Sequence, residues 1–185
     1  MTVRVVAGDA DATRAYGAAL AGVLRAGDLV VLTGGLGAGK TTLTQGVGAG
    51  LGVRGPVVSP TFTIARLQPS LTGGPALVHV DAYRLGSPDG GLDVSTELEA
   101  LDLDASLDSS VTVVEWGAGW VEALTDDRLE VNLERPRGSA GADDWADDAL
   151  DAAAGPRVIT VRGIGSRWSG VELPGGSGEY PGAIG

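Results

Sequence analysis

The stretch GGLGAGKT, residues 34–41, fits the pattern G-x-x-x-x-G-K-[ST] and carries Lys40, the only lysine in a chain that has twelve arginines. Glycines let successive backbone N–H groups turn inward around a phosphate, and the helix expected after them adds the positive end of its dipole. In this pattern the lysine reaches the β- and γ-phosphates, and the hydroxyl of the next residue, here Thr41, ligates Mg²⁺. The motif therefore predicts a P-loop that binds a nucleoside triphosphate.

A second glycine-rich stretch, GVGAGLG at residues 46–52, does not predict a dinucleotide site. The third glycine of that fingerprint is missing, because Leu51 stands in its place. The stretch also falls within an expected helix, whereas the fingerprint needs the turn between a strand and a helix.

Two carboxylates follow apolar strands and are candidates for completing a magnesium site. Asp81 ends the run ALVHVD, and Glu115 ends the run SVTVVE immediately before Trp116. Ligands in open α/β sheets sit at the carboxyl ends of the strands, so both are predicted to lie near the P-loop. Which of the two contacts the metal directly stays open. His79, two residues before Asp81, is expected to be a core histidine rather than a catalyst.

Threonines in SPTFT, residues 59–63, are candidates for sensing a γ-phosphate as switch segments do. The competing interpretation of Thr61 and Thr63 is an ordinary polar entry into a strand. The base is predicted to be adenine, because the Asn/Thr-Lys-x-Asp segment with which GTPases usually bind guanine needs a second lysine. Trp116 is a candidate stacking surface for the nucleotide.

The elements that must position these groups alternate between strands and helices. Short β-branched or apolar runs predict strands at 3–8, 28–34, 60–67, 76–83, 110–117, 128–134 and 157–163. Helices are predicted at 9–27, with Asp9 or Asp11 as N-cap and Gly27 as the end, and at 40–52, ending early because of its glycines. A helix or helical turn is predicted at 95–108. The alternation predicts an α/β, P-loop NTPase-like three-layer fold with a mostly parallel central sheet.

Composition excludes several kinds of function. A net charge of −11 opposes independent binding to DNA, RNA or an anionic membrane surface. The chain has no cysteine and one histidine, so it cannot form a disulfide framework or a zinc-finger ligand set. No apolar run reaches the length of a membrane span, and the N-terminus lacks a signal-peptide pattern. The expected location is the cytoplasm.

Five segments occur together in an order typical of one family. The chain resembles the TsaE (YjeE) ATPases of bacterial tRNA threonylcarbamoyladenosine formation over about residues 5–163. The resemblance is carried by GGLGAGKTTLTQG (34–46), SPTFT (59–63), HVDAYRL (79–85), ELEALDLD (97–104) and VEW (114–116).

The resemblance implies an ATPase that works with a TsaB–TsaD complex, which transfers a threonylcarbamoyl group to adenosine 37 of tRNAs reading ANN codons. The chain would meet tRNA only through these partners. Lys40, Asp81 and Glu115 are implied as catalytic, and Thr41, Asp81 and Glu115 as magnesium ligands. The residues expected to bind ATP are Thr13, Gly35, Gly37, Ala38, Gly39, Lys40, Thr41, Thr42, Thr61, Trp116 and Arg157.

The chain departs from the family pattern in two places. An acidic segment at about 138–155 interrupts the last strands of a domain expected to span 1–165, and the Gly/Pro-rich tail 166–185 is expected to be loosely attached. Two alternatives remain: a small-molecule kinase, whose lid at 136–156 would be acidic and would repel phosphate-rich substrates, and a non-hydrolytic nucleotide sensor. Hydrolysis without partners is expected to be slow unless Arg84 supplies a cation in cis.

Overall fold

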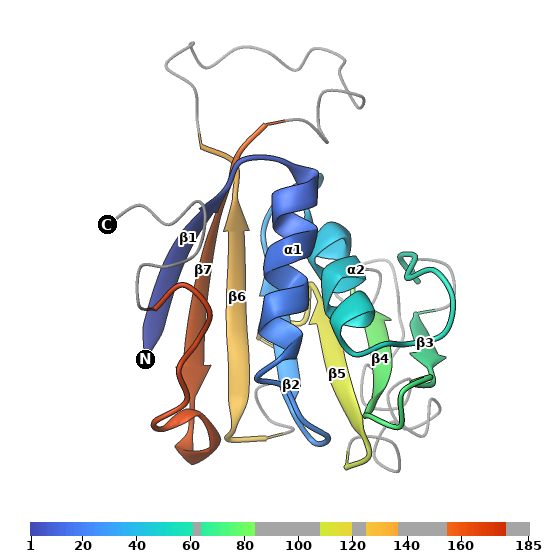
Figure 1. The fold of residues 1–185 in the computed structure, drawn as a ribbon. Helices are drawn as coiled ribbons and strands as arrows, with labels where there is room; N and C mark the ends of the chain where they lie inside the picture. The colour runs from blue at the N-terminus through green and yellow to red at the C-terminus, as the bar shows by residue number, and fades with distance from the viewer. Residues whose placement is uncertain (61–63, 84–107, 120–124, 137–154, 177–185) are drawn as a thin grey trace.

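Seven strands form one sheet in the computed structural model, which describes residues 1–60, 64–83, 108–119, 125–136 and 155–176 (Figure 1). Their order across the sheet is β1-β7-β6-β2-β5-β4-β3. The strands are β1 (Thr2–Ala7), β2 (Leu29–Thr33), β3 (Ala65–Gln68), β4 (Ala76–Asp81), β5 (Ser110–Glu115), β6 (Arg128–Glu134) and β7 (Arg157–Ile164). The helices among the described residues are α1 (Ala10–Ala21), α2 (Lys40–Gly50) and a short 3₁₀ turn, η3 (Ser166–Trp168).

The centre of the sheet is parallel and its edges are antiparallel. β2 pairs in parallel with β5 and β6, and β5 pairs in parallel with β4. The antiparallel pairs are β1–β7, β6–β7 and β3–β4. The predicted α/β P-loop-like fold with a mostly parallel central sheet is confirmed. Parallel pairing places the carboxyl ends of β2, β4 and β5 at one edge, with Asp81 directly opposite Glu115.

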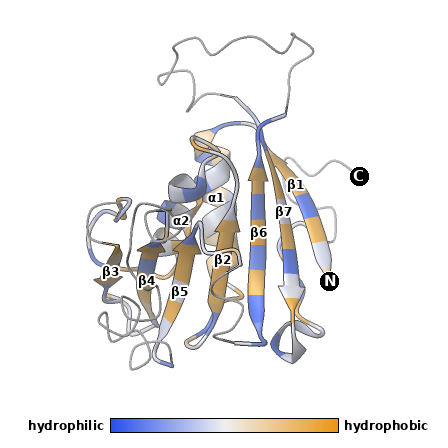
Figure 2. Cartoon of the chain, turned by 180° about the vertical axis from the view of Figure 1, so that it is seen from behind, coloured by the Kyte–Doolittle hydropathy of each residue, from blue (hydrophilic) through white to orange (hydrophobic). Residues whose placement is uncertain are grey.

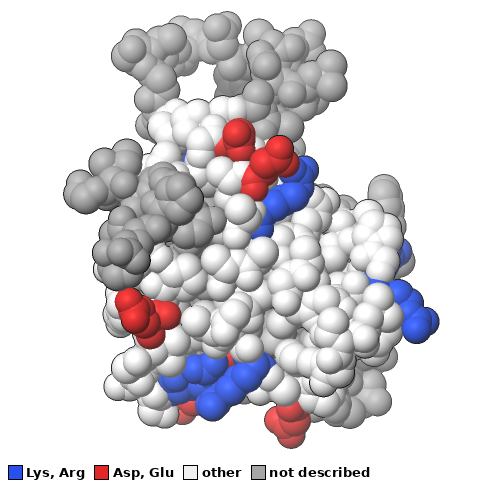
Figure 3. Space-filling model, viewed as in Figure 1, with Lys and Arg blue, Asp and Glu red and all other residues white. Residues whose placement is uncertain are grey.

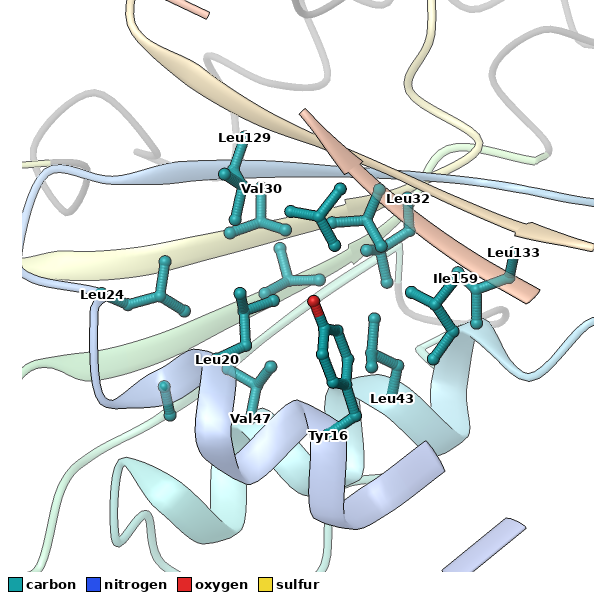
Figure 4. Close-up of a cluster of buried hydrophobic side chains, with 14 of the residues drawn as sticks. Tyr16, Leu20, Leu24, Val30, Leu32, Leu43, Val47, Leu129, Leu133 and Ile159 are labelled. Atoms are coloured by element: carbon teal, nitrogen blue, oxygen red, sulfur yellow. The ribbon is translucent and has the colours of Figure 1, made fainter. Parts of the chain in front are cut away.

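Both α-helices cover the same face of the sheet (Figure 1). Their buried side chains, including Tyr16, Leu20 and Leu43, pack against side chains of the central strands such as Val30 and Leu129 (Figure 4). Residues on the opposite face of β2, β4 and β5 form a second, smaller buried cluster. The helix or helical turn predicted at 95–108 lies outside the described residues except for its last position.

Burial explains why the strands differ in their pattern of apolar and polar residues. Every residue of β5 is buried, whereas β6 alternates between buried and partly exposed positions. Figure 2 shows this difference as a hydrophobic β2 and β5 beside an alternating β6 and β7. Continuous apolar runs are typical of strands that are buried on both faces. Alternation of apolar and polar residues is typical of strands that have one face in solvent.

The prediction that glycines end the second helix early is wrong, because α2 continues to Gly50. A Cβ on Gly46 would lie 2.1 Å from the Arg14 carbonyl oxygen, and one on Gly50 would lie 2.5 Å from the Ala21 Cβ. A Cβ on Gly17 of α1 would likewise lie 2.3 Å from the Leu43 oxygen. These glycines let the two helices approach closely, and that packing compensates for their low helix propensity.

Two further boundaries differ from prediction. Asp9 is the N-cap of α1, accepting a 2.7 Å hydrogen bond from the Ala12 N–H, but the helix ends at Ala21 and not near Gly27. Of the strand predicted at 60–67, the described residues 65–67 belong to β3, which ends at Gln68, whereas Pro60 and Ile64 lie outside a strand and Ile64 has a φ of 62°. Residues 61–63 lie outside the described part of the chain.

The first part of the predicted loose tail is packed on the domain, so that prediction is wrong for residues 166–176. Trp168 and Leu173 are buried, and the Arg167 guanidinium donates to both carboxylate oxygens of Asp28 at 2.9 and 2.8 Å. The Tyr16 hydroxyl donates to the Pro174 oxygen at 3.1 Å. Residues 177–185 lie outside the described chain.

Candidate functional site

A cavity of about 330 Å³ lies at the carboxyl edge of the parallel strands. It is lined by the glycine loop after β2, by the ends of β4 and β5, and by the starts of α1 and β7. Its lining residues are Ala10, Thr13, Leu36, Gly37, Ala38, Gly39, Lys40, Thr41, Thr42, Ser59, Asp81, Glu115, Trp116 and Arg157. Every predicted site residue that the structure describes lines this cavity except Gly35, whose carbonyl contacts Lys40.

The backbone of the loop requires glycine at specific positions. Gly34, Gly37 and Gly39 have φ angles of 140°, 72° and 101°, in the region that side chains other than glycine rarely adopt. A Cβ on Gly34 would also lie 2.4 Å from the Leu133 carbonyl oxygen of β6. The loop therefore fits closely against the sheet, and Gly39 turns the chain into α2 at its N-cap.

Lys40 is held inside the loop that precedes it. Its ammonium donates to the Gly34 oxygen at 2.8 Å and the Gly35 oxygen at 3.0 Å, and lies 3.8 Å from the centroid of the Trp116 ring. Burial lowers the pKa of Lys40 below its ordinary value, while the negative charges of Glu115 and Asp81 act in the opposite direction. Lys40 is therefore a cation held by the loop backbone and lining the cavity.

The two carboxylates are held by different partners. Glu115 Oε1 accepts a 2.9 Å hydrogen bond from the Thr41 hydroxyl and lies 2.8 Å from His79 Nε2. Asp81 accepts hydrogen bonds from the Ser59 hydroxyl and from the Tyr83 N–H, each 3.1 Å long. Ser59 is not among the predicted site residues, because in SPTFT only the threonines were candidates. Thr61 and Thr63 lie outside the described residues, as does Arg84.

Trp116 follows Glu115 with a φ of 62°, an unusual conformation for a large side chain. Its ring packs against the Lys40 ammonium and lies 5.3 Å, centroid to centroid, from the ring of Tyr83. These contacts place Trp116 beside the cation of the P-loop. Stacking of the ring on a nucleotide stays a prediction.

Arg157 contacts the loop backbone. Its Nε donates to the Ala38 oxygen at 3.0 Å and its Nη2 to the Gly37 oxygen at 3.3 Å, while Nη1 bonds the oxygens of Gly155 and Pro156. Burial is the main cause that lowers its pKa, and the positive charge of Arg135 adds to the effect. Arg157 therefore fixes two carbonyls of the P-loop from the start of β7.

Thr13 lies near the start of α1 and lines the cavity. Its hydroxyl donates to the Asp9 oxygen at 2.9 Å, and the side chain is buried. Contacts of Thr13 and Arg157 with a nucleotide remain predictions.

The donor set suits a nucleoside triphosphate with Mg²⁺. The Thr41 hydroxyl donates its hydrogen to Glu115, so the lone pairs of the Thr41 oxygen can bind a cation. Asp81 and Glu115 add carboxylate oxygens, which are hard ligands. In the described part of the chain, no group of three or more His, Cys, Asp or Glu side chains could hold a metal. Magnesium is usually bound by one or two carboxylates together with phosphates rather than by a cage of protein ligands.

Comparisons with known proteins assign the chain to a family. Residues 7–141 match the family model described as threonylcarbamoyl adenosine biosynthesis protein TsaE. The chain is 57% identical over 160 residues to the tRNA threonylcarbamoyladenosine biosynthesis protein TsaE of Streptomyces coelicolor, covering 86% of this chain and 96% of that protein. It is 49% identical over 126 residues to the protein of the same name from Mycobacterium leprae, covering 68% and 78% of the two chains.

A solved structure has the same fold. The crystal structure of YdiB from Bacillus subtilis is similar with a TM-score of 0.63 and 28% identity, over 91% of this chain and 90% of that one. The match of the family model, the identity to the two bacterial proteins and this structural likeness agree. The chain belongs to the TsaE family.

Proposed function

We propose that this protein binds and hydrolyses ATP with Mg²⁺ in the cavity, and that this ATP cycle supports threonylcarbamoyl transfer to adenosine 37 of tRNAs reading ANN codons. The observation that carries the proposal is the convergence of Lys40, Thr41 and Glu115, with Asp81 beside them, at one edge of the sheet. Family membership supports the role in tRNA modification.

The side chains divide the work on the triphosphate. Lys40 and the N–H groups of the loop bind phosphate oxygens, and the N-terminus of α2 adds its dipole. Thr41 and Glu115 would hold Mg²⁺, with Asp81 as the further carboxylate able to orient a water molecule. When bound, Mg²⁺ neutralises charge that builds up on the phosphates. Arg157 keeps the carbonyls of Gly37 and Ala38 hydrogen-bonded away from the phosphates.

The proposal places tRNA on a partner, a TsaB–TsaD-like complex. A chain with a net charge of −11 lacks the electrostatic attraction that binding to phosphate backbones requires. On the face shown in Figure 3, the basic side chains of the described residues stand in small separate groups. In the described chain, no helix combines the length and apolar character needed to cross a bilayer.

The test is ATP hydrolysis by the purified protein with Mg²⁺, alone and with TsaB–TsaD from the same organism, using Lys40→Ala as the blank. We expect slow hydrolysis alone, a changed rate with the partners, and loss of the activity in Lys40→Ala. Partners that neither bind nor change the rate would contradict the proposed role. If Glu115→Gln binds ATP without hydrolysing it and still supports modification of tRNA, the protein is a nucleotide sensor instead.

A further inference from the structure

His79 is a buried ionisable side chain near the cavity, and the proposed function gives it no role. It stands in the middle of β4, fully buried, and does not line the cavity. Strand alternation places it on the same face as Asp81, two residues later, and in register with Val113 of β5. His79 therefore lies next to the pair Asp81 and Glu115 along the strands, between these carboxylates and the hydrophobic core.

Among the described residues, the imidazole makes one hydrogen bond, to Glu115. Nε2 lies 2.8 Å from Glu115 Oε1, while Nδ1 is buried and has no hydrogen-bond partner among the described residues. An ionised carboxylate can only accept, so Nε2 carries the hydrogen and donates it. The tautomer with a hydrogen on Nε2 also avoids burying an unpaired N–H at Nδ1.

The same carboxylate oxygen accepts the Thr41 hydroxyl. Two donors, one from α2 and one from β4, thus meet at Glu115 Oε1. No hydrogen bond within the described residues reaches Oε2, which leaves this oxygen for a ligand in the cavity that Glu115 lines. A glutamate has three rotatable bonds, and two donors on one oxygen restrict them more than the Thr41 contact alone.

We infer that His79 is a positioning residue for the magnesium site: its Nε2–H fixes the Glu115 carboxylate so that Thr41 and Glu115 bind the cation together. This inference rests on the proposed function, because it concerns the Mg²⁺ that accompanies the nucleotide. Buried side chains that orient metal ligands typically change metal affinity by about 10- to 100-fold when they are removed.

The test measures ATP binding by calorimetry across a series of Mg²⁺ concentrations and in the presence of a chelator. In His79→Leu we expect the Mg²⁺ concentration for half-maximal enhancement of ATP binding to rise by about 10- to 100-fold. ATP binding with the chelator should match wild type, because Lys40 and the loop are untouched. His79→Gln, whose amide nitrogen can replace the imidazole Nε2–H, should restore most of the Mg²⁺ response.

Leu77 provides a matched control for packing. It is fully buried on the same strand face, two residues before His79. Leu77→Ala should lower the melting temperature without changing the Mg²⁺ requirement. An equal change in Mg²⁺ requirement in Leu77→Ala and His79→Leu would overturn the inference, because the effect would then be one of packing.

Two further comparisons of variants test whether His79 acts through its hydrogen bond to Glu115. If His79→Leu does not fold, His79→Gln is compared with His79→Asn, whose shorter side chain cannot place its amide at the Nε2 position. Equal Mg²⁺ requirements in these two variants would overturn the inference. In a Glu115→Gln background, His79→Leu should have almost no further effect, because His79 acts through that carboxylate.

The failure of this inference can be told apart from failure of the proposed function. If wild-type protein binds no ATP, or binds it without any response to Mg²⁺, the proposed function fails. If wild type responds to Mg²⁺ and folded His79→Leu responds at the same concentrations, only the role of His79 is refuted.

Discussion

The phosphate-binding half of the site comes from one continuous stretch of chain, whereas the carboxylate half is assembled from two strands. Lys40 is held by carbonyls of Gly34 and Gly35, a few residues before it. Asp81 and Glu115 meet only because β4 and β5 pair in a register that sets them opposite each other. The first half depends on local backbone geometry and the second on correct pairing of the sheet.

A hydrogen bond from the Thr41 hydroxyl to Glu115 joins the two halves. We therefore expect variants of the loop to weaken ATP binding whether or not Mg²⁺ is present. Variants of the carboxylate half should act mainly on the response to Mg²⁺.

Lys40→Ala should have the largest effect on the phosphate-binding half. It removes the cation together with the hydrogen bonds that the ammonium donates to the oxygens of Gly34 and Gly35. Loss of one preorganised donor to developing charge lowers rates by about 100- to 1000-fold, so ATP hydrolysis should fall at least that far. Lys40→Arg serves as the control that retains charge. ATP binding equal to wild type in Lys40→Ala would show that the loop does not bind the phosphates.

Glu115→Gln should affect mainly the carboxylate half. The amide keeps the size of the side chain but loses the negative charge that Mg²⁺ requires, so the Mg²⁺ needed for ATP binding should rise by about 100-fold. Binding in the presence of a chelator should be unchanged. Calorimetry with and without Mg²⁺ checks this, and an equal loss under both conditions would argue against a separate metal-binding half.

Gly34→Ala should damage the loop without removing any functional group. The residue has a φ of 140°, and its Cβ would lie 2.4 Å from the Leu133 oxygen. Strain and overpacking should lower the free energy of unfolding by about 2 kcal/mol or more, measured by denaturant titration. Gly35→Ala is the matched control, since its Cβ would meet nothing within 4 Å. Similar losses of unfolding free energy in both variants would contradict the close contact of Gly34 with Leu133.

Arg157→Met should loosen the loop by removing donors to the Gly37 and Ala38 carbonyls. Leaving such groups unpaired costs about 1–3 kcal/mol, so ATP affinity should fall about tenfold or more, with or without Mg²⁺. Arg157→Lys keeps the positive charge but not the planar guanidinium with its several donors, and should recover only part of the affinity for ATP. Full recovery by lysine would indicate that charge alone matters at this position.

The smallest effect should come from pH. Burial lowers the pKa of Lys40 below 10.5, so the ammonium loses its proton at a lower pH than an exposed lysine would. Affinity for ATP should be highest while Lys40 is charged and should decline as alkaline pH rises through that lowered pKa. In Lys40→Arg the decline should disappear, because a guanidinium stays charged. The same alkaline decline in both proteins would assign it to another group.

Much of the fold could be predicted from sequence because the strands are short and strongly apolar. The positions of β1, β2, β4, β5, β6 and β7 were predicted within one or two residues. The helix ends were harder to predict, since glycine normally disfavours helices. In α2 the glycines are retained because Gly46 and Gly50 touch α1, and a single sequence does not show that contact.

The candidate site was predictable where a motif is contiguous and less so where contacts cross the sheet. The geometry around Lys40 and Thr41 follows from one pattern. The contact of Ser59 with Asp81, and that of Arg157 with the loop, depend on residues brought together by the sheet. The packed segment 166–176 was missed because Gly and Pro outnumber its buried Trp168 and Leu173.

The most direct measurement is a calorimetric titration of ATP into wild type, Lys40→Ala and Glu115→Gln, each with Mg²⁺ and with a chelator. We predict that wild type binds more tightly with Mg²⁺, that Lys40→Ala loses binding under both conditions, and that Glu115→Gln loses only the gain from Mg²⁺. Wild-type binding by Lys40→Ala, or an unchanged response to Mg²⁺ in Glu115→Gln, would contradict a single site formed by the P-loop and the two carboxylates.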